Sequence, residues 1–221
     1  MRVLIVGASR GLGLEFVAQY RADGDPVHAT ARDEAGLQRL AARGATAIRL
    51  DVTDARAGSV LAAALKGLAF DIVVVNAGVY GPSSSGLEPP STEDFDQVMH
   101  TNVLGPMRVL PALAAALAPA ARVGVISSRM GSIGLRTAAN GWLYRASKAA
   151  VNSVLKDASL VLAGRAVCVA LHPGWVRTDM GGTGADLDVA TSVADLRRTL
   201  AGLRAEHHGR FFNHDGTELA W

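Results

Sequence analysis

Residues 3–13 read Val-Leu-Ile-Val-Gly-Ala-Ser-Arg-Gly-Leu-Gly, so four apolar residues lead directly into a turn with glycine at positions 7, 11 and 13. The run Val3–Val6 is short and has no polar alternation, which predicts a strand covered on both faces. A segment of helix length, Leu12–Ala22, follows the turn. Glycines between a strand and a helix let a phosphate group approach the backbone and the free N–H groups of the helix. The stretch therefore predicts a nucleotide-binding unit.

The same alternation of short apolar runs and helix-length segments continues along the chain. The further apolar runs are Val27–Ala31, Ala47–Leu50, Ile72–Val75, Val123–Ile126 and Val167–Leu171. The further helical candidates are Glu34–Arg43, Ala55–Lys66, Thr92–Leu117 and Trp142–Leu162. This alternation predicts one α/β domain over residues 1–221, a doubly wound Rossmann fold with a mostly parallel sheet of about seven strands.

Composition narrows the class of protein. Of the 221 residues, 49% are apolar, which is enough to bury one large core. The 22 basic and 20 acidic residues are spread along the chain, so we expect no nucleic-acid or membrane partner and a cytoplasmic protein. The longest apolar stretch, Val109–Ile126, is interrupted by prolines and an arginine, and we interpret it as a helix end followed by a buried strand. Cys168 is the only cysteine, and no Cys/His cluster has metal-ligand spacing, so we expect no metal.

The spacing Gly-x-x-x-Gly-x-Gly in the first turn resembles the cofactor turn of the short-chain dehydrogenase/reductase family. Members of that family usually have Thr where this chain has Val6. Taken alone, a glycine-rich turn is also found in ordinary strand–helix connections. The resemblance implies cofactor contacts in the first turn from Gly7, Ser9, Arg10, Gly11, Leu12 and Gly13.

The second strand bears on the choice of cofactor. It ends Ala29-Thr30-Ala31-Arg32, without the acidic residue that would favour a free ribose 2′-hydroxyl. The guanidinium groups of Arg32 and Arg10 suit a 2′-phosphate, so we expect NADP(H) in preference to NAD(H). Both arginines have the alternative of being solvated surface residues, and Asp33 and Glu34 would soften the preference.

Further turns of the resembled family bind the adenosine part of the cofactor. Asp51 and Val52 would border the adenine, with helix capping as an alternative or additional role for Asp51. The triplet Asn76, Ala77 and Gly78 matches the family's Asn-Ala-Gly signature and would lie against the ribose.

Tyr144 and Lys148 are spaced i, i+4 and so lie on one face of a helix, one turn apart. A free Tyr has a pKa of roughly 10, and a nearby ammonium would pull that pKa toward neutrality. Ser128 follows a predicted strand, where its hydroxyl would polarise a substrate carbonyl. The family's fourth catalytic position matches Asn102, with a water-holding and helix-distorting role in a proton relay through Lys. Without the rest of the set, each of these residues has an ordinary structural interpretation.

The segment after the sixth apolar run, His172–Thr178, resembles the family's Pro-Gly motif, which contacts the nicotinamide carboxamide. That resemblance implies cofactor contacts from Pro173, Gly174, Val176 and Thr178. The run Tyr144–Lys148, the segment Pro173–Met180 and the ending Gly216–Trp221 are most similar to the branch with C-factor-like proteins and Sniffer-type carbonyl reductases. In most members the serine lies nearer to the Tyr than Ser128 does here, so Ser127 and Ser132 stay as alternatives.

The resemblance implies an NADP(H)-dependent enzyme that interconverts a carbonyl and an alcohol by hydride transfer, with Asn102, Ser128, Tyr144 and Lys148 as its catalytic residues. The substrate would be a small carbonyl or alcohol compound, covered by a lid over residues 181–203. The alternatives are an NADP(H)-responsive signalling or binding module without significant turnover, and an epimerase or dehydratase, whose C-terminal substrate region tends to be larger. Related proteins pair their long helices across a two-fold axis, so we expect a homodimer or homotetramer.

Overall fold

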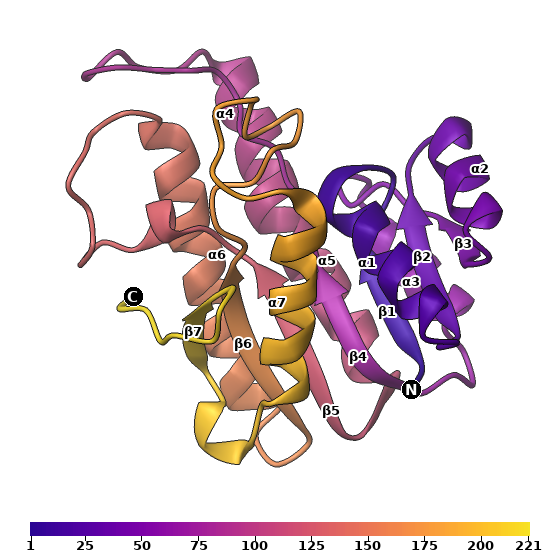
Figure 1. Cartoon of the computed structure of the whole chain (residues 1–221). Helices are drawn as coiled ribbons and strands as arrows, with labels where there is room; N and C mark the ends of the chain where they lie inside the picture. The colour runs from indigo at the N-terminus through magenta and orange to yellow at the C-terminus, as the bar shows by residue number, and fades with distance from the viewer.

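Seven strands pair side by side in the computed structural model, which describes residues 1–221 (Figure 1). Their order across the sheet is β3-β2-β1-β4-β5-β6-β7, and every neighbouring pair is parallel. The strands are β1 (Val3–Val6), β2 (Val27–Ala31), β3 (Thr46–Arg49), β4 (Phe70–Val75), β5 (Leu117–Ile126), β6 (Ala166–His172) and β7 (Arg210–Asn213). The predicted doubly wound α/β fold is confirmed, and β7 is the strand for which no apolar run was recognised.

Two layers of helices cover the two faces of the sheet (Figure 1). On one face, α1 (Gly11–Ala22), α2 (Glu34–Ala42) and α7 (Val189–Ala201) contribute to a core of 21 buried residues. On the other face, α3 (Ala57–Ala64), α5 (Gly105–Ala114) and α6 (Trp142–Val161) contribute to a core of 27. Burial on both sides explains why the strand sequences lack polar alternation. None of the helices combines the length and the apolar character needed to cross a bilayer.

The long helix predicted over 92–117 is two helices joined by a wider turn. Helix α4 covers Thr92–Met99, a π-helical turn covers His100–Leu104, and α5 follows directly. The residues after Ala114 leave the helix, and β5 begins at Leu117. A π-turn inserts an extra residue into the helix and rotates the side chains that follow, which bears on Asn102 at its centre.

The segment 181–203, predicted as a substrate lid, divides into two parts. Its second part is α7, whose Val193, Leu196 and Leu200 are fully buried in the core against the sheet. Such a helix cannot swing away without exposing these side chains to water. We therefore restrict the proposed lid to the irregular residues 181–188.

The order in which successive strands are added to the sheet reverses at its centre, between β1 and β4. Ligands of doubly wound sheets bind at the carboxyl end of the strands at this switch point. Two backbone N–H groups, of Asn76 and Ala77, donate to the Val6 carbonyl at 2.9 and 3.0 Å, so the turns after β1 and β4 lie directly against one another.

Candidate active site

One cavity of about 430 Å³ runs along the carboxyl edge of the sheet. It extends from the turn after β1 to the side chains of Tyr144 and Lys148 on α6. Most of the predicted site residues line it, namely Gly7, Ser9, Arg10, Gly11, Leu12, Arg32, Asp51, Val52, Asn76, Ala77, Gly78, Tyr144, Lys148, Pro173 and Thr178. The residues predicted from five separate turns are therefore brought to a single elongated site.

The turn after β1 is glycine-rich for steric reasons. Gly7 has a φ of +85°, and a Cβ there would lie 2.6 Å from the backbone of Ala77. A Cβ at Gly13 would lie 2.3 Å from the Gly7 carbonyl oxygen, so Gly13 packs behind the turn instead of lining the cavity. The amide of Asn76 donates to the same carbonyl at 2.6 Å and fixes the turn. These contacts fix the position of the turn, so that the backbone at the start of α1 faces the cavity.

A hydroxyl group is present at this turn despite Val6. The Oγ1 atom of Thr30, a fully buried residue of β2, accepts a hydrogen bond from the Gly7 backbone N–H at 2.9 Å. Sequence reasoning missed Thr30, because its partner lies on a different strand and nothing in the local sequence connects them.

Arginines surround the cavity at the end of β2. Both predicted residues, Arg32 and Arg10, line it, and a third cation, Arg39 of α2, was not predicted. The Nε of Arg39 donates to the Ser9 carbonyl at 2.8 Å, which holds its guanidinium beside the glycine turn. Arg10 forms an exposed ion pair with Asp179 at 2.5 Å, so part of its charge is matched within the protein.

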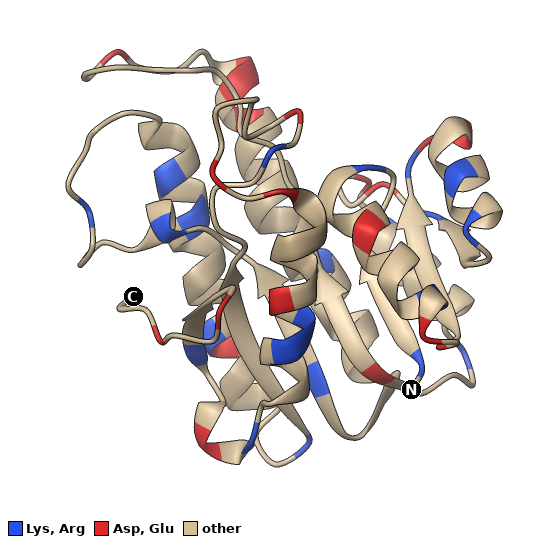
Figure 2. Cartoon of the chain, in the orientation of Figure 1, with Lys and Arg blue, Asp and Glu red and all other residues tan.

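The two acids after Arg32 have partners of their own. Asp33 accepts a hydrogen bond from the Gly36 N–H at 2.7 Å as the N-cap of α2. Glu34 pairs with Arg49 at 2.5 Å. Neither carboxylate is directed at the Arg32 guanidinium, for which no ion pair is found. The cluster of basic side chains therefore keeps a positive balance, although acidic and basic residues are interspersed over the molecule as a whole (Figure 2).

The helix-capping interpretation of Asp51 is wrong, because α3 begins only at Ala57 with Arg56 as its N-cap, and Asp51 instead stabilises a local turn. Its Oδ1 accepts hydrogen bonds from the N–H and the hydroxyl of Thr53 at 2.9 and 2.7 Å. Asp51, Val52 and Thr53 all line the cavity, so this turn forms part of the cavity wall.

Tyr144 and Lys148 are both buried on α6, with 8% and 4% of their surface exposed. The Lys148 Nζ donates to the Ile126 carbonyl oxygen at 2.9 Å and lies 5.7 Å from the centre of the Tyr144 ring. Burial lowers the pKa of Lys148 to about 8, because the ammonium loses solvation. Burial likewise raises the pKa of Tyr144 to about 12, with a smaller lowering contribution from Ser128 and a raising one from Tyr80. The expected lowering of the Tyr144 pKa by the Lys148 ammonium is not found: the pKa is raised, and the only lowering contribution comes from Ser128.

Among the three candidate serines, Ser128 is the one that affects the pKa of Tyr144, which it lowers. Its hydroxyl accepts a hydrogen bond from the Met130 N–H at 3.1 Å, and the residue lies outside the lining of the cavity. The hydroxyl of Ser127 donates to Asn152 Oδ1 at 2.5 Å, although the residue also lines the cavity. The hydroxyl of Ser132 donates to the backbone carbonyls of Ala220 and Trp221 at 2.7 and 3.1 Å. The hydroxyls of Ser127 and Ser132 are engaged with other partners, and the effect on the Tyr144 pKa favours Ser128 as the partner of Tyr144.

Asn102 lies one layer behind the cavity, 1% exposed, in the π-turn. Its Oδ1 accepts from the Val79 N–H, and its Nδ2 donates to the Val79 carbonyl, both at 2.8 Å. The same Nδ2 donates to Ser147 Oγ at 2.9 Å. A Cβ at Gly78 would lie 3.3 Å from Asn102 Oδ1 and 3.4 Å from Lys148 Nζ, so only glycine leaves these two groups undisturbed.

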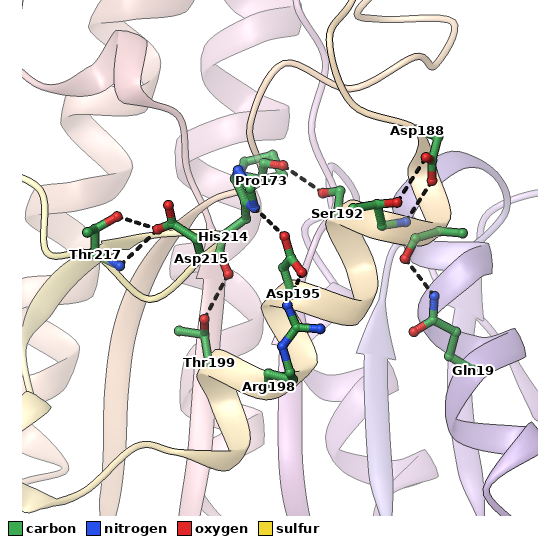
Figure 3. Close-up of polar contacts among 12 residues, drawn as sticks. Gln19, Pro173, Asp188, Ser192, Asp195, Arg198, Thr199, His214, Asp215 and Thr217 are labelled. Atoms are coloured by element: carbon green, nitrogen blue, oxygen red, sulfur yellow. Dashed lines mark hydrogen bonds and ion pairs between the residues drawn. The ribbon is translucent and has the colours of Figure 1, made fainter.

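The Pro173-Gly174 segment is held from behind by α7 and the C-terminal turn (Figure 3). Ser192 donates to the Pro173 carbonyl at 2.6 Å. The His214 ring, paired with Asp195 at 2.7 Å, packs against Gly174, where a Cβ would lie 3.1 Å from the ring. Of this segment, Pro173 lines the cavity and Gly174 does not.

The residues that follow Gly174 also differ in their placement. Thr178 lines the cavity, whereas Val176 is 5% exposed and forms a β-bridge with Leu187 outside its lining. Arg177 also lines the cavity, although it was not singled out from the sequence. Its guanidinium donates to the Ala185 carbonyl at 3.1 Å and so connects the proposed lid to the segment after Gly174.

Comparison with known proteins agrees with this geometry. The model of the short chain dehydrogenase family matches residues 1–186. The C-signal protein of Myxococcus xanthus is 42% identical over 154 residues, which are 68% of this chain and 92% of that protein. The carbonyl reductase Sniffer of D. melanogaster superposes with a TM-score of 0.91 at 32% identity, covering 100% of this chain and 99% of its own. The NADPH-bound carbonyl reductase from chicken fatty liver gives 0.88 at 32% identity, with 100% and 98% covered. This protein therefore belongs to the short-chain dehydrogenase/reductase family, in the branch of C-factor-like and Sniffer-type proteins.

Proposed function

We propose that this chain is an NADP(H)-dependent oxidoreductase that reduces a carbonyl group to an alcohol, or catalyses the reverse reaction. The observation that supports this most is the placement of Tyr144 and Lys148 in the same cavity as the glycine turn, with Ser128 near enough to lower the pKa of Tyr144. A proton donor beside an open cofactor-sized groove is what carbonyl reduction requires.

The cofactor proposal rests on the residues along the groove. The turn from Gly7 to Gly13 would hold the pyrophosphate, since most of its residues line the cavity and the N-terminus of a helix offers backbone N–H groups to an anion. Arg32 and Arg39 would bind the 2′-phosphate, because the nearby Asp33 and Glu34 are engaged elsewhere. The chicken carbonyl reductase, similar over the whole chain, has NADPH bound.

The reaction adds a hydride to the carbonyl carbon and a proton to its oxygen. The hydride comes from NADPH when that cofactor is bound. Tyr144 would donate the proton from its hydroxyl, and Ser128 would hold the substrate oxygen by a hydrogen bond as negative charge develops. A substrate oxygen placed between these two hydroxyls is oriented for both interactions at once.

Lys148 and Asn102 would restore the proton to Tyr144. A Lys148 pKa of about 8 lies near neutrality, so this side chain can release and recover a proton at low free-energy cost. Asn102 lies beside it across Gly78 and holds the backbone of Val79. In this proposal it also orders the water that reaches Lys148.

The test compares the parent protein with Tyr144→Phe. We expect Tyr144→Phe to bind NADPH with unchanged affinity and to lose carbonyl reduction by at least about 100-fold, because the ring stays and only the proton donor is removed. Binding is followed by fluorescence titration and turnover by NADPH absorbance on a panel of ketones, aldehydes and quinones. Near-normal turnover by Tyr144→Phe would refute the mechanism. Tight NADPH binding without turnover of any panel member by the parent would instead favour the NADP(H)-responsive binding module.

A further inference from the structure

Tyr80 lies in the loop that follows β4, two residues after Gly78. The preceding residue, Val79, has both backbone groups held by Asn102, with two hydrogen bonds of 2.8 Å. Asn102 is buried, so these bonds are shielded from competing water. The backbone at Tyr80 therefore starts from a fixed point, although the loop beyond it is irregular.

The ring of Tyr80 packs against the ring of Tyr144. The two ring centres are 4.6 Å apart and the planes are inclined by 31°. At this separation no water molecule fits between the rings, so one face of the Tyr144 phenol is covered by Tyr80.

The other side of Tyr80 is held by the turn before α6. A Cβ at Gly141 would lie 2.6 Å from the Tyr80 hydroxyl oxygen, so only glycine allows this approach. Gly141 has a φ of +65°, and its N–H donates to the Ser84 carbonyl at 3.0 Å. The Tyr80 ring is therefore enclosed between the Gly141 turn and the Tyr144 ring.

We propose that Tyr80 is a positioning residue for Tyr144, whose ring fixes the direction of the phenol and keeps water from its covered face. The inference rests on the proposed role of Tyr144 as proton donor and adds a residue outside the four predicted catalytic positions. It is the aromatic ring of Tyr80 that acts, since no hydrogen bond of its hydroxyl is found.

The electrostatics of Tyr144 agree with this geometry. Desolvation is the largest cause of its raised pKa, as expected for a phenol enclosed by neighbouring side chains; the smaller raising contribution of Tyr80 is a charge interaction with its hydroxyl. The other groups that face Tyr144 are the Ser128 hydroxyl, after β5, and the Lys148 ammonium, one turn along α6. A variant that uncovers the ring should let water reach the phenolate and lower the pKa of Tyr144.

The kinetic test compares Tyr80→Phe, Tyr80→Ala and Phe95→Ala. Tyr80→Phe keeps the ring and should keep kcat within about twofold, whereas Tyr80→Ala should lower kcat about tenfold through misplacement of the phenol. Phe95→Ala removes an aromatic ring that is 47% exposed on α4 and serves as the control, with kcat unchanged. NADPH affinity should be the same in all variants. Parent-like kcat in Tyr80→Ala, or equal losses in Tyr80→Phe and Tyr80→Ala, would overturn the proposal.

A second measurement follows Tyr144 directly, without substrate or cofactor. The ¹³Cζ NMR signal of Tyr144, assigned with Tyr144→Phe, is titrated up to pH 10.5 while circular dichroism confirms the fold. In the parent and in Tyr80→Phe the signal should stay unshifted up to pH 10.5. In Tyr80→Ala the pKa of Tyr144 should be about one pH unit lower, so the signal should begin to shift within this range. Identical titrations in Tyr80→Ala and Tyr80→Phe would overturn the proposal. Normal turnover by Tyr144→Phe would refute the proposed function alone, because this titration depends only on the contact between the rings.

Discussion

Lys148 should make the stability of the protein depend on pH in the alkaline range. Its pKa falls from the ordinary 10.5 to about 8, because the side chain is buried and has one hydrogen-bond partner, the Ile126 carbonyl. A shift of this size corresponds to about 3 kcal/mol at 1.36 kcal/mol per pH unit. At pH 7 the folded protein still holds Lys148 as an ammonium, and burial of this charge lowers the free energy of unfolding.

The sign follows from proton counting. Between pH 8 and 10.5 the unfolded chain keeps a proton on Lys148 that the folded chain has released, so the free energy of unfolding rises with pH. Below pH 8 both states hold the proton, and the destabilisation is present in full. From pH 8 to pH 10 the gain in the free energy of unfolding should be about 2 kcal/mol.

The measurement is urea unfolding at pH 8, 9 and 10 on the parent and on Lys148→Met, which has similar length and no charge. Groups common to both proteins cancel in the difference between them. The parent should gain about 1 M in urea midpoint relative to Lys148→Met over this range, from ordinary values of the urea dependence. A difference between the two proteins that stays constant from pH 8 to pH 10 would show that Lys148 is not destabilised as an ammonium, and the reasoning about its role in proton transfer would fail.

Three further predictions concern the other site residues. Ser128→Ala should lower kcat about 100-fold with unchanged NADPH affinity, whereas Ser132→Ala should affect mainly the melting temperature, and steady-state kinetics with thermal unfolding separates the two. Removing either basic side chain, in Arg32→Ala or Arg39→Ala, should weaken NADPH binding by about tenfold or more and leave NADH binding nearly unchanged, and equal losses for both cofactors in a fluorescence titration would contradict the cofactor argument. Asn102→Ala leaves the part-buried backbone groups of Val79 without their partner and should cost about 2 kcal/mol of unfolding free energy in urea, where a loss below about 0.5 kcal/mol would contradict its structural role.

The fold was predictable because the strands of a parallel sheet are covered on both faces. Runs such as Val3–Val6 and Val27–Ala31 are then apolar throughout, and they match the observed strands β1 and β2. The seventh strand, Arg210–Asn213, has only two apolar residues and lies at the edge of the sheet, so its composition does not distinguish it from a loop. Helix α7 was missed for a related reason, since its Ala, Thr and Ser residues obscure the spacing of the three buried side chains.

The site residues that belong to motifs directly after strands could be predicted from the sequence. Contacts between segments far apart in the sequence could not be predicted from residue spacing. The proposal of Ser128 rests on its effect on the pKa of Tyr144, and Ser132 is disfavoured because its hydroxyl bonds the carbonyl of Trp221 at the end of the chain. Arg39 belongs to the same category, because its position depends on how α2 packs beside the glycine turn.

The π-turn at His100–Leu104 explains how the side chain of Asn102 can contact segments that are far apart in the sequence. An extra residue in a helical turn rotates the residues around it away from the positions of a regular α-helix. In this turn Asn102 points toward both the loop after β4 and helix α6, where it bonds Val79 and Ser147. Ser147 in turn donates to the Tyr144 carbonyl at 2.8 Å.

A buried amide therefore joins the backbone before Tyr80 to the helix that presents Tyr144, and the two rings meet as a consequence. An aspartate at position 102 would keep the acceptor for the Val79 N–H but lose the donor to Ser147 and the Val79 carbonyl. Only an amide pairs with all three groups at once. The asparagine at position 102 therefore serves to place Tyr144 and the Tyr80 ring that covers it, as well as any transfer of a proton through Lys148.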